Sequence, residues 1–135
     1  MNVIITGGAG LIGRALAADL AAHGHAVTIL SRNPAGVAGL PPGVEAAAWD
    51  ARSGAGWIER AAAADAIVNL AGAGIAGDGA LPTRWSPARK RMILESRLNA
   101  GRAVVDAIQK AGAKPRCLIQ ASGIGYYGPT GDAPI

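Results

Sequence analysis

The stretch from Val3 to Gly13 limits what this chain can fold into more than any other part of the sequence. It begins with an apolar, β-branched run, turns through glycines and enters a helical pattern. Its glycines are spaced as G-x-G-x-x-G (Gly8, Gly10, Gly13) and as T-G-x-x-G-x-x-G (Gly7, Gly10, Gly13). That spacing permits a tight turn, a close approach of the backbone to a diphosphate, and close packing of helix on strand.

The order strand, glycine loop, helix predicts a dinucleotide site rather than an ordinary glycine-rich turn. The amides of the first helical turn would face the diphosphate, aided by the helix dipole. We expect the binding residues here to be Gly7, Gly10, Leu11, Ile12 and Gly13. A P-loop is not indicated, because no Gly-Lys-Ser/Thr follows the glycines.

Strands alternate with helices along the rest of the chain. Apolar runs predict strands at 1–6, 26–30, 44–49, 66–70 and 116–122, and helical spacing predicts helices at 11–23, 57–63 and 87–111. This alternation predicts the α/β class: a Rossmann-type three-layer αβα fold with a parallel sheet of about five strands in the order 3-2-1-4-5.

Periodicity also assigns the residues that should face the core. For the first helix they are Ile12, Leu16 and Leu20, and for the long helix Ile93 or Leu94, Leu98, Gly101, Val105 and Ile108. Cys117, the single cysteine, falls in a predicted buried strand, which indicates an inert core thiol and excludes an internal disulfide.

Composition narrows the classes of partner. The 135 residues suit one domain, and the net charge of +4 suits an anionic cofactor. Few aromatic residues and no long basic run argue against nucleic acid, and no apolar stretch reaches membrane-spanning length. His23 and His25 have no cysteine or acid cluster nearby, so no metal site is expected. The N-terminus does not read as a signal peptide, and a cytoplasmic location is expected.

The end of the second strand indicates which dinucleotide binds. NAD sites place an acid there for the ribose 2′-hydroxyl. This chain has Ser31 and Arg32 instead, and no acid lies between Asp19 and Glu45. Arg32 would attract a 2′-phosphate and Ser31 could add a hydroxyl donor, so NADP is the predicted cofactor, although a solvated loop arginine is the alternative.

Two further strand ends should line the crevice. Asp50 follows the third strand and could accept a hydrogen bond from the adenine amino group, or could cap a turn. Ala71, Gly72 and Ala73 follow the fourth strand, where small residues would let the cofactor pass.

Taken together, the sequence resembles the extended short-chain dehydrogenase/reductase superfamily, and more narrowly its atypical epimerase-family oxidoreductases, which are nucleoside-diphosphate-sugar epimerase-like. The matching stretches are residues 5–14, 30–34, 68–73, 84–90 (Arg-Trp-Ser-Pro-Ala-Arg-Lys), 96–99 and 121–128, which includes Gly-Tyr-Tyr-Gly.

The resemblance implies that residues 1–135 form an NADP(H)-binding Rossmann domain, incomplete and without the substrate domain that follows it in the family. It implies that Ser122 bonds a substrate oxygen, that Asn99 serves a proton relay, and that Tyr127 lines the substrate pocket. The family's Tyr-x-x-x-Lys is absent from this chain, and the fragment is expected to be inactive alone.

Three functions stay open at this point. The first is an NADP(H)-dependent oxidoreductase or epimerase acting on a small-molecule substrate, with anionic and nucleotide-sugar-like molecules as candidates. The second is a non-catalytic NADP(H) sensor. The third is a structural fragment that self-associates, for example as a homodimer, through a strand edge or the long helix.

Overall fold

The computed structural model describes residues 1–75, 84–112 and 115–122. Five strands form the sheet: β1 (Asn2–Thr6), β2 (Ala26–Ser31), β3 (Val44–Ala48), β4 (Ala66–Asn69) and β5 (Cys117–Gln120). The helices are α1 (Leu11–Ala22), α2 (Ile58–Ala63), α3 (Pro87–Lys110) and the short 3₁₀ helix η1 (Pro34–Gly36). Each lies within two residues of the range expected from the sequence, apart from η1, which falls between the predicted strands 26–30 and 44–49.

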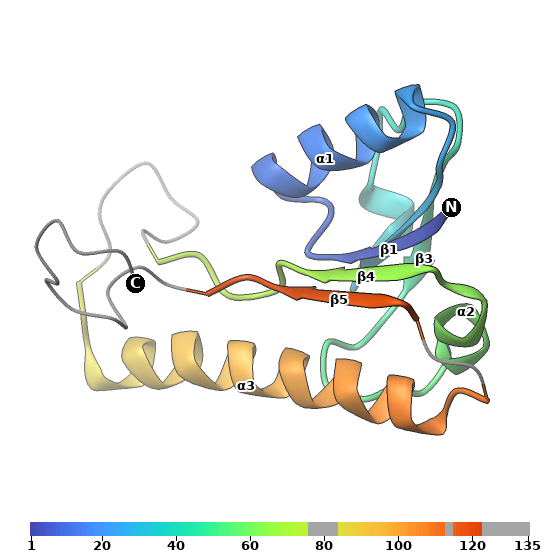
Figure 1. Ribbon diagram of the computed structural model, residues 1–135. Helices are drawn as coiled ribbons and strands as arrows, with labels where there is room; N and C mark the ends of the chain where they lie inside the picture. Colours follow the sequence, from blue (N-terminus) through green and yellow to red (C-terminus); the bar gives the residue numbers. More distant parts are fainter. Residues whose placement is uncertain (76–83, 113–114, 123–135) are drawn as a thin grey trace, which may run out of the picture.

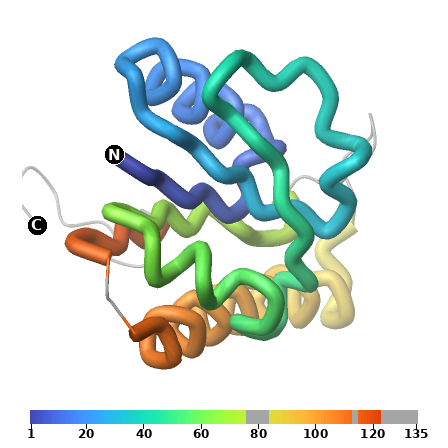
Figure 2. The backbone as a smooth tube through the Cα atoms, turned by 90° about the vertical axis from the view of Figure 1, so that its right-hand side faces the viewer, coloured from blue at the N-terminus to red at the C-terminus, as the bar shows by residue number. Residues whose placement is uncertain are grey.

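The sheet is parallel throughout and its strand order is β3-β2-β1-β4-β5, which confirms the predicted Rossmann topology. Helix α1 lies over one face of the sheet, and α2 and α3 lie over the other (Figure 1). The view along the strands shows the three layers (Figure 2). No helix among the described residues combines the length and apolar character needed to cross a bilayer.

Each face of the sheet has its own core. On the α1 side the strands contribute Val3, Ile5, Val27, Ile29 and Val68, which pack with Ala17. On the α2 and α3 side, Ile4, Leu30 and Ile67 pack with the two tryptophans Trp49 and Trp57 and with alanines of both helices. The central strands are buried on both faces, as expected for a parallel sheet.

The long helix α3 faces the core with only part of the set that its periodicity indicated: Ile108 packs on the core. Leu94, Leu98 and Val105 are exposed, whereas the buried residues are Ala100, Ala103, Val104 and Ala107. Small side chains allow the helix to lie close to β4 and α2, so the larger side chains occupy the neighbouring stripe. The described residues leave that stripe uncovered.

Two other burial predictions were wrong. Ile12 is exposed, because the start of α1 reaches past the strand ends, while Leu16 and Leu20 do pack on the core. Cys117 is also exposed. It pairs in register with Ala66 on the α1 side of the sheet, but α1 lies over β1, β2 and β3 and does not cover β5.

The glycine loop packs against its surroundings backbone to backbone. A Cβ on Gly13 would lie 2.4 Å from Cα of Gly8, and a Cβ on Gly7 would lie 2.8 Å from the carbonyl carbon of Leu70. Gly7 also has φ +68°, a left-handed conformation that favours glycine. The spacing of the glycines is therefore required by packing as well as by any ligand.

A pair of helical glycines tests this packing. Gly13→Ala should lower the free energy of unfolding by about 2 to 3 kcal/mol, because backbone atoms must move to admit the methyl group. Gly101→Ala in α3 is the matched control: nothing lies within 4 Å of its Cβ position, and alanine favours a helix over glycine by up to about 1 kcal/mol. Urea denaturation should therefore show opposite shifts for the two variants, and equal shifts would contradict the account.

Candidate functional site

The carboxyl ends of all five strands lie at one edge of the sheet, and the predicted binding residues follow these ends. Backbone hydrogen bonds continue the ladder beyond the strands, from Trp49 N to Ser31 O (3.0 Å), from Leu70 N to Thr6 O (3.1 Å) and from Ala121 N to Asn69 O (3.0 Å). The edge is therefore a continuous, ordered surface. In open α/β sheets, ligands bind in the crevice at this edge, where the strand order reverses.

The glycine loop occupies the middle of the edge, between β1 and α1. The amide of Gly10 donates to Gly7 O (3.1 Å) and closes the turn. Gly10 is also the N-cap of α1 and has no side chain to cap the helix, whose first turn carries no acidic residue. The N–H groups of that turn are thus left to an external anion. Leu11 and Ile12 are 90% and 71% exposed at this position.

Arg14 ties the glycine loop to the segment after β2. Its Nε donates to Ala9 O (3.0 Å) and its Nη1 donates to Ala38 O (2.8 Å). The guanidinium therefore lies between the two segments that would enclose the adenosine end of a dinucleotide.

At the end of β2 the predicted ribose-binding residues, Ser31 and Arg32, have polar groups available to a ligand. Ser31 Oγ accepts a hydrogen bond from the amide of Asn33 (3.1 Å), which leaves its hydroxyl proton available. Arg32 is exposed, and no hydrogen bond or ion pair joins its side chain to another described residue. Asn33 Oδ1 accepts from the amide of Gly36 and starts η1.

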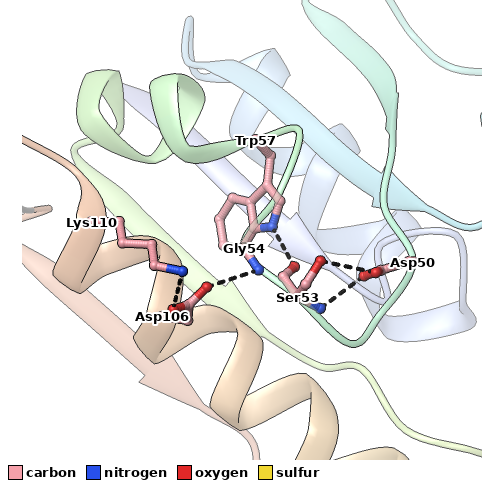
Figure 3. Close-up of polar contacts among 6 residues, drawn as sticks. All are labelled: Asp50, Ser53, Gly54, Trp57, Asp106 and Lys110. Atoms are coloured by element: carbon pink, nitrogen blue, oxygen red, sulfur yellow. Dashed lines mark hydrogen bonds and ion pairs between the residues drawn. The ribbon is translucent and has the colours of Figure 1, made fainter.

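Asp50 caps a turn after β3, so the turn-forming alternative is correct for its local role. Its Oδ1 accepts from the amides of Arg52 (2.8 Å) and Ser53 (2.9 Å), and its Oδ2 accepts from the Ser53 hydroxyl (2.9 Å; Figure 3). These bonds, that of Arg52 first, hold the pKa of the Asp50 carboxyl below its ordinary value. The carboxylate is exposed and retains a lone pair on Oδ2 for a further donor.

The same turn is anchored to α3 beneath the sheet. The amide of Gly54 donates to Asp106 Oδ2 (3.3 Å), and Lys110 Nζ lies 2.8 Å from Asp106 Oδ1 (Figure 3). The bond from Lys110, together with that from Gly54, lowers the pKa of Asp106. The indole N–H groups of Trp49 and Trp57 both donate to Ser53 O. The bond between Gly54 and Asp106 joins residues 52 positions apart, and no local sequence pattern indicated it.

A chain of polar side chains crosses three strands at the edge. The Thr6 hydroxyl donates to Asn69 Oδ1, and Asn69 Nδ2 donates to Gln120 Oε1 (2.7 Å). Thr6 and Asn69 are almost fully buried. Because buried polar groups must be paired, this chain fixes the relative positions of the ends of β1, β4 and β5. In the sequence, this chain is marked only by a polar residue at the end of each of three apolar strands.

The loop after β4, residues 71–75, is held by side chains of α3. Ser96 and Arg97 bind the backbone of Ala73, and Arg89 binds that of Gly74. A Cβ on Gly72 would lie 3.0 Å from Cζ of Arg97. The arginine side chain therefore fits here because residue 72 is a glycine.

The residues that the family resemblance linked to catalysis are only partly placed. Ser122 follows β5 at the carboxyl edge and is exposed, and Asn99 is half-buried on α3. Tyr127 and its neighbour Tyr126 lie outside the described residues. Within the described ranges, no three His, Cys, Asp or Glu side chains gather as metal ligands.

A groove of about 450 Å³ lies elsewhere, at the amino ends of β1, β2 and β3, beside α2. Its charged groups, Glu45 and Arg60, are already paired with each other. The carboxyl edge, in contrast, offers uncapped amides and the guanidinium of Arg32, which has no partner among the described residues; an anionic dinucleotide needs such groups.

The sequence and the fold both match known proteins. The model of the NAD dependent epimerase/dehydratase family matches residues 3–135. Epimerase family protein YfhF of Bacillus subtilis is 40% identical over 128 residues, which are 95% of this chain and 39% of that protein. The chain therefore spans well under half the length of this relative.

Solved structures give the same picture. The crystal structure of human epimerase family protein SDR39U1 (isoform 2) with NADPH matches at a TM-score of 0.70 and 33% identity, and covers 96% of this chain and 39% of that one. MoeE5 in complex with UDP-glucose and NAD matches at a TM-score of 0.70 and 25% identity, with 95% and 38% covered.

The Asp50 turn predicts a pH dependence of stability. A carboxyl whose pKa is lowered by folding stabilises the protein above its unfolded pKa of about 4, and that contribution is lost as the pH falls through the folded value. Asp50→Asn should therefore be less stable than the unchanged protein at pH 7, and the difference should shrink below about pH 4. Urea midpoints between neutral and acidic pH measure this, and a constant difference would contradict it.

Proposed function

This chain belongs to the NAD dependent epimerase/dehydratase family, and on that premise we propose that it is the NADP(H)-binding Rossmann domain of an NADP(H)-dependent oxidoreductase or epimerase. Residues 1–135 supply the cofactor half of the active site. The observation that carries the proposal is the carboxyl edge of the sheet, where the uncapped first turn of α1 and the exposed guanidinium of Arg32 follow adjacent strands.

The residues present fit a phosphorylated dinucleotide. The glycine loop leaves no side chain between the backbone and a diphosphate, and a Cβ on Gly10 would lie only 3.3 Å from Gly7 O. The amides of Leu11, Ile12 and Gly13 hold the diphosphate, and Arg32 and the Ser31 hydroxyl hold the 2′-phosphate. When bound, the nicotinamide supplies or accepts a hydride.

The choice of NADP over NAD follows from charge. An acid after β2 would repel a 2′-phosphate, whereas this chain carries Arg32 there. A hydrogen bond to a charged group contributes about 1.5 to 3 kcal/mol. The NADPH in the human SDR39U1 structure supports the same choice. Asp50 accepts from the adenine amino group with its remaining lone pair, and Ala71, Gly72 and Ala73 line the path of the cofactor.

The substrate is a small molecule that binds beside the end of β5. Ser122 bonds its reacting oxygen, Asn99 supports a proton relay, and Tyr127 lines its pocket. The UDP-glucose in the MoeE5 complex supports a nucleotide-sugar-like substrate. The basic start of α3, which carries Arg89, Lys90 and Arg91, supports an anionic one.

Reversing the charge at Arg32 tests the cofactor assignment. Arg32→Glu should weaken NADPH binding by about tenfold to a hundredfold, because a charge-assisted bond is lost and a repulsion is added. NADH binding should change little. Titration of the cofactor's fluorescence against full-length protein measures both affinities.

Arg102→Glu is the matched control, since it makes the same charge change on α3, on the other side of the sheet from α1. It should leave both affinities unchanged. Equal losses of NADPH and NADH in Arg32→Glu would refute the role of Arg32.

A further inference from the structure

The loop after β4 depends on α3 for its backbone hydrogen bonds. Residues 71–75 form no helix or strand, so their N–H and C=O groups need other partners. From the end of β4, Asn69 Oδ1 accepts a hydrogen bond from the amide of Ala71 (3.3 Å). The other bonds that the described residues give to this loop come from the first half of α3, which extends past the carboxyl ends of β4 and β5 (Figure 1).

Ser96 holds the amide of Ala73. Its Oγ accepts from Ala73 N at 2.9 Å and donates to Ile93 O, one turn back in α3, at 2.9 Å. Because the hydroxyl proton is committed to Ile93, a lone pair is left facing the loop. The serine therefore fixes the direction in which the Ala73 peptide points.

Arg97 and Arg89 hold the carbonyl groups of the same loop. Arg97 Nη1 donates to Ala73 O (3.2 Å) and to Ile93 O (3.1 Å), and Arg89 Nη2 donates to Gly74 O (2.7 Å). The Arg97 side chain also packs on Gly72, at the position where a Cβ would stand. The backbone N–H and C=O groups of Ala73 are thus both bound by neighbouring residues of one helix.

We propose that Ser96 and Arg97 are positioning residues, which hold loop 71–75 in the conformation that receives the part of the dinucleotide beyond its adenosine. The inference rests on the proposed function. The adenosine end lies by β2, and β4 lies on the opposite side of β1. The loop after β4 therefore faces the diphosphate and the nicotinamide half. Its first residue, Ala71, also lies against Gly7 of the diphosphate loop, where a Cβ would come within 2.9 Å of Ala71 N.

The test is Ser96→Ala in the full-length protein, because alanine suits a helix and this variant should fold. Two ligands are titrated by calorimetry: NADPH, and adenosine 2′,5′-bisphosphate, which carries only the adenosine end. NADPH affinity should fall about tenfold, as expected when only about a tenth of the molecules keep the receptive loop. The bisphosphate affinity should stay within about twofold. Ser96→Thr, which keeps a hydroxyl that can bond the preceding turn, should restore NADPH binding.

A cofactor-free measurement separates this inference from the proposed function. Amide hydrogen exchange at Ala73 should be at least about tenfold faster in Ser96→Ala than in the unchanged protein. In Ser96→Thr the exchange rate should return to that of the unchanged protein. Absence of NADPH binding by the unchanged protein would contradict the proposed function itself. NADPH binding by Ser96→Ala at the unchanged affinity, equal losses of both ligands, or unchanged exchange at Ala73 would each overturn the positioning role.

Discussion

The contact on which the site depends is the packing of the glycine loop, backbone against backbone, between β1, α1 and the end of β4. No side chain fits at Gly7 or Gly13, where a Cβ would approach neighbouring backbone to 2.8 and 2.4 Å. This contact brings the uncapped first turn of α1 to the carboxyl edge of the sheet. The anion-binding amides follow from the way the chain packs, before any ligand is considered.

The rest of the edge is ordered around that contact by polar bonds from two directions. Within the sheet, Thr6, Asn69 and Gln120 connect three strand ends. From below, α3 holds the loop after β4 through Ser96 and Arg97, and holds the turn after β3 through Asp106. Its 24 residues span about 36 Å, against about 13 Å for a four-residue strand, so one helix reaches both. Because the loops of the crevice are already ordered, less of the free energy of ligand binding is lost in ordering them.

The sequence predicted most of the fold, because the information was local. Alternating strand and helix patterns gave the elements, and the right-handed crossover rule gave the strand order that the structure confirms. It also placed the glycine loop, Ser31, Asp50 and the Ala71 segment at strand ends that the structure brings to one edge. The face of α3 was predicted only in part: Ile108 does pack on the core, but Leu98 and Val105 were taken as inward where alanines allow the closer contact. The bonds from Ser96 to Ala73 and from Asp106 to Gly54 join residues 23 and 52 positions apart, and no local pattern reveals such pairs.

The central claim is that an NADP dinucleotide lies along the carboxyl edge with its diphosphate on the first turn of α1. The most direct measurement is the backbone amide spectrum of the full-length protein during titration with NADPH. The account predicts saturable shifts at residues 7–13, 31–33 and 71–73. Shifts confined to the groove at the amino ends of the strands, around Asn2, Gly43 and Glu45, with the glycine-loop amides unmoved, would contradict it.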